Sequence, residues 1–158
     1  MNLFFLRHAN ADWPEWNKPD DERPLTKRGK KESRQVAKFL ERTKVSIDLI
    51  VTSPLPRAAQ TAKIVARRLK AKLDKNERLA PGFSAAKLNA LLKSHRRGAL
   101  MIVGHEPDFS GVVRTLTGGA IKLAKAGIAV VQLEQPTMRG RLLWLVSPNE
   151  IKRSSGKK

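Results

Sequence analysis

Two histidines and two arginines lie just behind short apolar runs of this chain, at positions where strands of an open sheet are expected to end in loops. They are Arg7 and His8 behind residues 3–6, Arg57 behind residues 48–53, and His105 behind residues 99–104. A neutral imidazole held through one ring nitrogen can attack phosphorus with the other, and water then hydrolyses the phosphohistidine. The planar fork of an arginine stays charged at any working pH and binds two phosphoryl oxygens at once. These side chains could therefore hold and attack a phosphoryl group, in a site that needs no metal.

The apolar runs predict the elements that would position these residues. Continuous apolar segments near 2–6, 48–52 and 99–103 are typical of strands buried on both faces of a parallel sheet. Apolar residues at helical spacing predict helices near 32–40, 57–69, 88–92 and 109–116. Two late strands, 128–133 and 141–146, follow each other through a turn that contains Pro and Gly. This order predicts an α/β fold, a three-layer α/β/α sandwich with a mixed, mostly parallel sheet.

The length and composition indicate one compact unit. A chain of 158 residues matches about one domain, and 41% hydrophobic residues are enough for a buried core. We expect one domain over residues 1–148 and a basic, disordered tail over residues 149–158. Residues 12–23, polar and rich in Pro and Asp, are expected to form a surface loop. Trp13 and Trp16 on that loop either line the substrate entrance or pack the loop onto the domain.

The charge of the chain favours anionic ligands. The formal net charge is +18, from 32 basic and 14 acidic residues. A field of this size attracts anions of any kind and favours phosphorylated substrates without naming one. Aromatic residues make up only 5% of the chain and Tyr is absent, which disfavours a role in nucleic-acid binding.

The sequence also limits the cofactors and the compartment. It has no cysteine, so it holds neither a disulfide framework nor a thiolate nucleophile, and it shows no cofactor motif. The first residues lack a basic segment before the apolar run, and no apolar stretch is long enough to span a bilayer. We therefore expect a cytoplasmic protein without a membrane partner, a cofactor or a metal.

Four short motifs follow one another along most of the chain. They are Arg-His-Ala at 7–9, Arg-Pro-Leu-Thr with a glycine at 23–29, Ser-Pro-Leu-Pro-Arg-Ala-Ala-Gln-Thr at 53–61, and Gly-His-Glu-Pro at 104–107. In order and spacing together they resemble the SixA-type phosphohistidine phosphatases, a short branch of the histidine phosphatase superfamily that includes the phosphoglycerate mutases. The resemblance implies a phosphoglycerate mutase-like fold. Only residues 65–100 separate the third motif from the fourth, which leaves no room for the large lid of longer members.

The resemblance also implies a role for each site residue. His8 would be the nucleophile, Arg7 and Arg57 would bind the phosphoryl oxygens, and His105 would complete the phosphate pocket. The family protonates the leaving group with a carboxylic acid, and here Asp20 is the first candidate.

Three other carboxyl groups are alternatives for the proton donor: Asp21, Asp12 and Glu106. For Glu106, as for Asp108, we favour a structural role at the start of the next helix, where a carboxylate is stabilised by the helix dipole. Supporting contacts around the site are expected from Thr26, Ser53 and Gln60, which lie within or beside the motifs.

The sequence therefore predicts a metal-independent phosphatase that acts through phosphorylated His8 on phosphohistidine in a partner protein. An open pocket with a positive rim would also accept small phosphate esters or nucleotides. A mutase is disfavoured because it needs a closed pocket to retain its intermediate. A third reading is a basic module that binds phosphate or polyanions without turnover.

Overall fold

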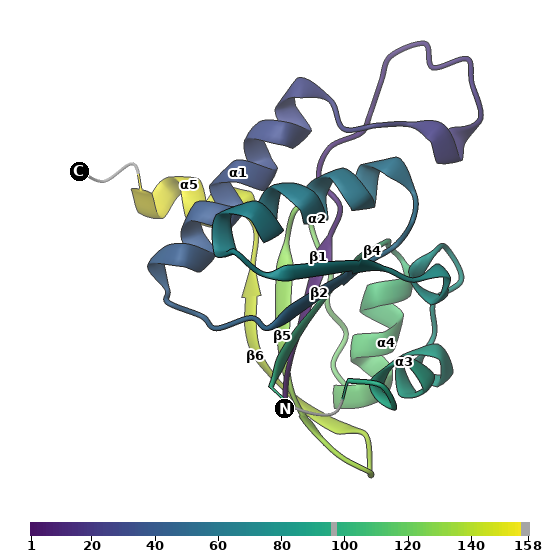
Figure 1. Cartoon of the computed structure of the whole chain (residues 1–158), viewed down its shortest axis with the longest axis vertical. Coiled ribbons are helices and arrows are strands. Elements are labelled where there is room, and N and C mark those ends of the chain that lie inside the picture. The colour runs from purple at the N-terminus through teal and green to yellow at the C-terminus, as the bar shows by residue number, and fades with distance from the viewer. Residues whose placement is uncertain (96–97, 156–158) are drawn as a thin grey trace.

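The computed structural model describes residues 1–95 and 98–155, in which strands and helices alternate along the chain (Figure 1). The strands are β1 (Asn2–Arg7), β2 (Leu49–Thr52), β3 (Lys72–Lys75), β4 (Ala99–Gly104), β5 (Ile128–Glu134) and β6 (Arg139–Val146). The helices are α1 (Lys27–Arg42), α2 (Pro56–Leu69), α3 (Ala85–Leu92), α4 (Asp108–Thr117) and α5 (Pro148–Ser155), with short 3-10 turns η1 (Asp20–Glu22) and η2 (Glu77–Leu79).

The six strands form one sheet in the order β3-β2-β4-β1-β5-β6. The first four run parallel to their neighbours, β5 runs antiparallel to β1, and β6 runs antiparallel to β5. The central strand β1 is apolar on both faces, and Leu3, Phe5 and Leu6 are fully buried. The mixed, mostly parallel sheet is therefore confirmed. The carboxyl ends of β1, β2 and β4 meet at one edge of the sheet, where such folds place their sites.

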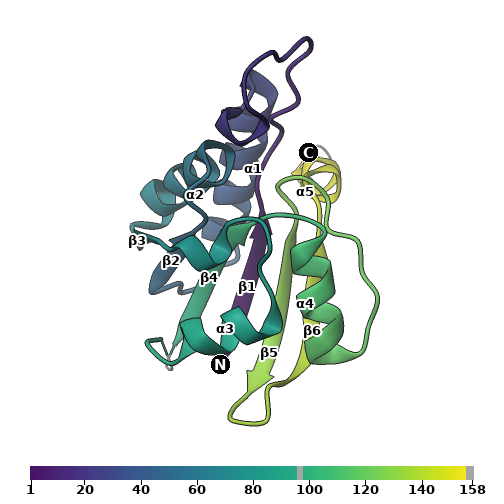
Figure 2. The same cartoon turned by 90° about the vertical axis from the view of Figure 1, so that its right-hand side faces the viewer.

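Helices cover both faces of the sheet (Figure 2). The face under α1, α2 and α5 buries residues such as Leu40, Val65 and Ile151 against the sheet. The face under α3 and α4 is packed around Phe5 and Phe109. Their rings contact edge to face, with the ring centroids 5.2 Å apart. These two apolar layers confirm the predicted three-layer α/β/α sandwich.

Strand β3 is an element that the apolar pattern did not predict. Its residues Lys72, Asp74 and Lys75 are exposed, and only Leu73 is half-buried, so the segment has too little apolar character to be recognised as a strand. It is stabilised by parallel pairing with β2 at the outer edge of the sheet. Together with η2 and α3 it makes up the regular structure described between α2 and β4.

The end of the chain also differs from its predicted form. Residues 149–155, expected to be part of a disordered tail, lie in helix α5, which packs beside α1 (Figure 1). The side chain of Ile151 is 3% exposed and belongs to the core under α1. One apolar residue among charged neighbours gives no periodic signal, so only the tertiary packing identifies this helix. Residues 156–158 of the predicted tail lie outside the described residues.

No helix within the described residues combines the length and the apolar character that crossing a membrane requires.

Candidate active site

The four residues singled out in the sequence come together at the carboxyl edge of the sheet. The backbone N–H of His8 donates to the carbonyl of Gly104 at 3.0 Å, which joins the ends of β1 and β4. The imidazole centroids of His8 and His105 are 5.3 Å apart. Arg57, in the first turn of α2, is buried, and its charge acts on both imidazoles together with that of Arg7.

The hydrogen bond made by His8 defines the state of its ring. Nδ1 lies 2.8 Å from the carbonyl oxygen of Ala9. A carbonyl oxygen can only accept, so Nδ1 carries the proton and Nε2 keeps its lone pair. Burial is the main cause that lowers the pKa of His8 to about 3, and the positive charges of Arg57 and Arg7 lower it further. The ring is therefore neutral near pH 7, with Nε2 available as a nucleophile.

Ser53 controls the second imidazole. Its Oγ lies 2.8 Å from Nε2 of His105 and also accepts a hydrogen bond from the backbone N–H of Leu55 at 3.2 Å. The hydroxyl of Ser53 can donate its proton to Nε2, and in that tautomer the proton of neutral His105 lies on Nδ1. Burial is the main cause that lowers the pKa of His105 to about 4. Nδ1 is buried and has no hydrogen-bond partner within the described residues, so it can donate to an anion.

The two arginines also have unused donors. Arg7 donates from Nη1 to the carbonyl of Leu123 at 3.0 Å, and Arg57 donates from Nη1 to the carbonyl of Asp20 at 3.2 Å. The Nε of each is buried without a hydrogen-bond partner among the residues that the structure describes. A buried donor left unpaired costs roughly 1–3 kcal/mol. A bound phosphoryl group would supply acceptors for both arginines and for His105.

Thr61 ties the loop after β1 to helix α2. Its Oγ1 donates to the carbonyl of Arg57 at 2.7 Å and accepts from the backbone N–H of Ala9 at 3.1 Å. This bridge fixes the loop after β1 relative to Arg57. Thr61 closes the third motif, but the sequence pattern does not predict this bridging role.

The supporting residues named from the sequence make contacts around the same loop. Thr26 caps α1 by accepting from the backbone N–H of Gly29, and its Oγ1 donates to Asn10 Oδ1 at 2.8 Å. A Cβ at Gly29 would lie 2.1 Å from the carbonyl oxygen of Asn10, so only glycine allows this approach. Gln60 accepts from the backbone N–H of Leu25 at 2.7 Å.

Two of the four candidate proton donors lie at the mouth of the site. One carboxylate oxygen each of Asp20 and Asp21 lies 4.0 Å from Nη2 of Arg57, and Asp20 also lies 2.8 Å from Nε of Arg23. Both aspartates sit on η1 with more than two thirds of the side chain exposed. The structure therefore brings both carboxylates to Arg57, within reach of solvent.

Asp12 is occupied by ion pairs. It lies 3.6 Å from Arg23 and forms a charged hydrogen bond with Lys125, which is the main cause that lowers the pKa of Asp12. Within the described residues its ion pairs join Asp12 to Arg23 and Lys125 and not to Arg57.

Glu106 and Asp108 have structural roles, as favoured from the sequence. The carboxylate of Glu106 accepts from the backbone N–H of Ser110 at 2.7 Å and from the Ser110 hydroxyl, which closes the first turn of α4. Asp108 accepts from the backbone N–H groups of Gly82 and Phe83 and thereby anchors the segment that leads into α3.

The two tryptophans pack the loop that follows β1, and Trp13 also borders a hollow. The indole N–H of Trp13 donates to the carbonyl of Pro24 at 2.8 Å, and that of Trp16 donates to the carbonyl of Pro19 at 3.1 Å, so both pack the loop. The ring of Trp13 is nevertheless 39% exposed. It borders a hollow of about 600 Å³ that Asp20 also lines.

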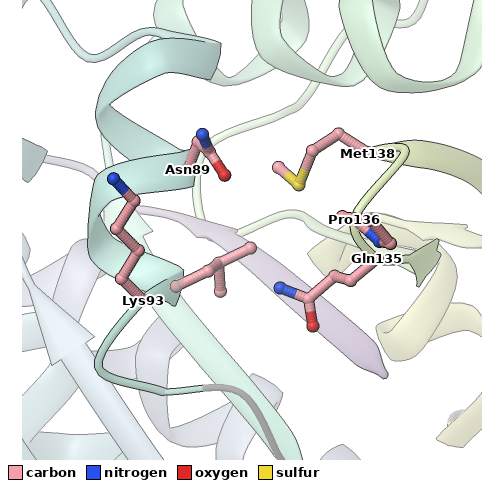
Figure 3. Close-up of a pocket in the computed structure, with 6 residues that line it drawn as sticks. Asn89, Lys93, Gln135, Pro136 and Met138 are labelled. Carbon is pink, nitrogen blue, oxygen red and sulfur yellow. The ribbon is translucent and has the colours of Figure 1, made fainter.

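A second hollow lies away from these residues. It has a volume of about 400 Å³ and separates α3 from the turn between β5 and β6, where Asn89 and Met138 point toward one another (Figure 3). That turn lies near the amino end of β1, because Leu133 pairs with Met1. The hollow is thus at the opposite edge of the sheet from His8. Within the described ranges, no group of three or more His, Asp and Glu side chains is placed to hold a metal ion.

The neutral histidines predict how stability depends on pH. His8 and His105 have lowered pKa values in the folded protein, about 3 and about 4, whereas both titrate near 6.5 in the unfolded chain. Between these values the unfolded state binds more protons, so the free energy of unfolding falls as pH falls below 6.5. We expect a loss of about 3 kcal/mol between pH 6.5 and 5, from the two histidines together, in urea-unfolding curves. The variant His8→Ala/His105→Ala should have a shallower slope, and an unchanged slope would contradict the assignment.

The chain is similar in sequence and in structure to known phosphatases. Residues 3–81 match the family model of the histidine phosphatase superfamily (branch 1). The chain is 34% identical over 143 residues to an uncharacterized protein of Picosynechococcus, with 81% of this chain and 82% of that protein covered. It is 30% identical over 160 residues to the phosphohistidine phosphatase SixA of Escherichia coli, with 96% and 97% covered. A solved structure of the protein histidine phosphatase SixA complexed with tungstate has a TM-score of 0.86 and 28% identity, with 96% and 100% covered.

Proposed function

Because this chain belongs to the histidine phosphatase superfamily and is of the SixA type, we propose that it hydrolyses phosphohistidine in proteins through a phosphorylated His8. The chain is a phosphatase by its family, and the proposal concerns its substrate and its mechanism. One observation carries it: a neutral His8 with a free Nε2 lies beside three buried donors without partners, on Arg7, Arg57 and His105.

In the first step, Nε2 of His8 forms a bond to phosphorus while the bond from phosphorus to the substrate nitrogen breaks. Arg7, Arg57 and Nδ1–H of His105 stabilise the charge on the non-bridging oxygens. Asp20 donates a proton to the departing nitrogen. In the second step, Asp20 takes a proton from water, the water oxygen bonds to phosphorus, and inorganic phosphate leaves His8 neutral.

The open mouth of the site supports a protein substrate. The described part of the segment between α2 and β4 holds β3, η2 and α3, none of which is a lid insertion. The carboxylates of Asp20 and Asp21 are exposed at the mouth. A phosphorylated side chain on a protein surface can enter such a site, whereas a closed pocket would exclude it. The proposal is also supported by the E. coli relative, which is a phosphohistidine phosphatase.

The substrate is tested by comparing kcat/KM for a phosphohistidine peptide, a phosphoserine peptide, an aryl phosphate and a sugar phosphate, all with a chelator present. We expect the highest value for the phosphohistidine peptide. If the sugar phosphate is hydrolysed efficiently and the phosphohistidine peptide is not, the proposed mechanism stands and the proposed substrate is wrong. An absence of turnover on all four would favour the reading as a binding module.

If Asp20 is the proton donor, the loss of activity on its replacement should depend on the leaving group. Asp20→Asn should lower kcat about 100-fold for an alkyl phosphate, whose leaving group needs a proton, and much less for a nitrophenyl phosphate. Asp21→Asn is the matched control, because its carboxylate lies at the same 4.0 Å from Arg57. If Asp21→Asn shows the selective loss and Asp20→Asn does not, the proton donor is Asp21.

A further inference from the structure

Helix α1 begins with cations where a helix favours anions. Its 16 residues include seven basic and two acidic side chains, and its first turn holds basic residues and no acidic one. The amino end of a helix carries partial positive charge, so cations there are destabilising. Like charges four residues apart, as at Lys27 and Lys31 or Lys30 and Arg34, add further repulsion. A helix whose charges oppose its own dipole in this way is expected where the exposed surface serves a function.

These cations line a groove. A hollow of about 530 Å³ lies between the first turns of α1 and the start of α5. Lys27, Lys31 and Arg34 line it from α1, and all three are exposed and form no ion pair within the described residues. Asn149 and Lys152 line it from α5. Lys27, Lys31 and Arg34 thus present positive charge without an ion-pair partner among the described residues, in a concave surface.

The basic surface continues past Arg34. A second hollow of about 440 Å³ between α1 and α2 shares Arg34 with the groove and is also lined by Lys38, Arg67 and Arg68. Of these, Arg68 is paired with Glu41. The positive strip is therefore long enough to meet an extended surface rather than a single ion.

Hydrogen bonds connect the groove to the loop after β1, which contains His8 and Asn10. Glu32, also in the groove lining, accepts from the backbone N–H of Asn10 at 3.2 Å, and Thr26 at the start of α1 bonds Asn10 as well. Asn10 lies two residues after His8. A macromolecule held in the groove would thus lie beside the mouth of the candidate active site.

We propose that the basic groove formed by Lys27, Lys31 and Arg34 is the docking surface for the acidic face of the phosphorylated protein substrate. The inference rests on the proposed function, since it names the surface chemistry of that substrate. Charges at the rim of a complex mainly set the association rate and its salt dependence. A protein is favoured over a nucleic acid because the groove lining contains no aromatic side chain on which bases could stack.

The test uses two synthetic phosphohistidine peptides, one flanked by glutamates and one by glutamines. The variant Lys27→Glu/Lys31→Glu/Arg34→Glu should raise KM for the glutamate peptide about tenfold while leaving kcat unchanged. Its KM for the glutamine peptide and for an aryl phosphate should match the wild type. The matched control reverses three exposed cations of α3, its C-cap and α4, Lys87→Glu/Lys93→Glu/Arg114→Glu, and should leave all KM values as in the wild type.

Other outcomes separate this inference from the proposed function. If the wild type hydrolyses both peptides with equal KM and the groove variant changes neither, the docking surface is wrong and the function stands. If the wild type hydrolyses the aryl phosphate and neither peptide, the proposed substrate is wrong. The docking surface is then tested by the binding of the unphosphorylated glutamate peptide, measured by fluorescence anisotropy. Binding by the wild type that is lost in the groove variant supports docking, and an absence of binding by the wild type overturns it. Duplex DNA bound through these cations, with no binding of the glutamate peptide, would also overturn it.

Discussion

Replacing His8 by alanine is expected to lower kcat for an aryl phosphate by a factor of about 10⁴ or more, the scale of losing a catalytic nucleophile. The other groups of the site can still bind a phosphoryl group, but none of them has the free nitrogen that His8 keeps by donating Nδ1–H to the carbonyl of Ala9. The initial rate of phosphate release measures this loss. A variant with wild-type activity on every substrate would remove His8 from the mechanism.

The same experiment can identify the intermediate. Rapid quenching of the wild type with radiolabelled substrate should trap phosphate on the protein in a form stable to alkali and labile to acid, as a phosphoramidate is. The chain offers a matched control, because His95 lies outside the site in the segment after α3. His95→Ala should retain both the activity and the trapped phosphate. Label that persists in His8→Ala would place the intermediate on another residue.

Replacing Arg57 by methionine is expected to lower the activity and to raise the stability of the folded protein. We expect kcat/KM to fall about 10³-fold, because the charge that develops on the phosphoryl oxygens loses a buried guanidinium. In anion-free buffer the free energy of unfolding should rise by about 1 kcal/mol, since the substitution removes a desolvated charge with an unpaired Nε. Enzyme kinetics and urea unfolding measure the two effects.

A ligand measurement completes the test of Arg57. Phosphate should raise the melting temperature of the wild type, because it binds only the folded state, and should have a much smaller effect on Arg57→Met. Lys63→Met is the matched control, since Lys63 lies on the same helix and is exposed. It should show wild-type kinetics and the wild-type response to phosphate. A large loss of stability in Arg57→Met would show instead that Arg57 mainly supports the fold.

The site residues could be found in the sequence because each follows an element that the sequence marks strongly. The buried strands β1, β2 and β4 are continuous apolar runs, so their carboxyl ends, and with them His8 and His105, were placed correctly. Strand β3 and helix α5 were not predicted as such, because Leu73 and Ile151 are isolated apolar residues among charged ones. Their stability comes from pairing with β2 and from packing beside α1, which local patterns do not record.

The sequence by itself determined which groups are candidates for chemistry: the residue types, their order in four motifs, and the strand ends that carry them. Only the tertiary structure decided what each group contacts. Nδ1 of His8 bonds the carbonyl of Ala9, Nε2 of His105 bonds the hydroxyl of Ser53, Glu106 caps a helix, and Asp20 and Asp21 meet Arg57. These assignments depend on hydrogen bonds between segments far apart in the chain, and such bonds exist only once the sheet has brought the segments together.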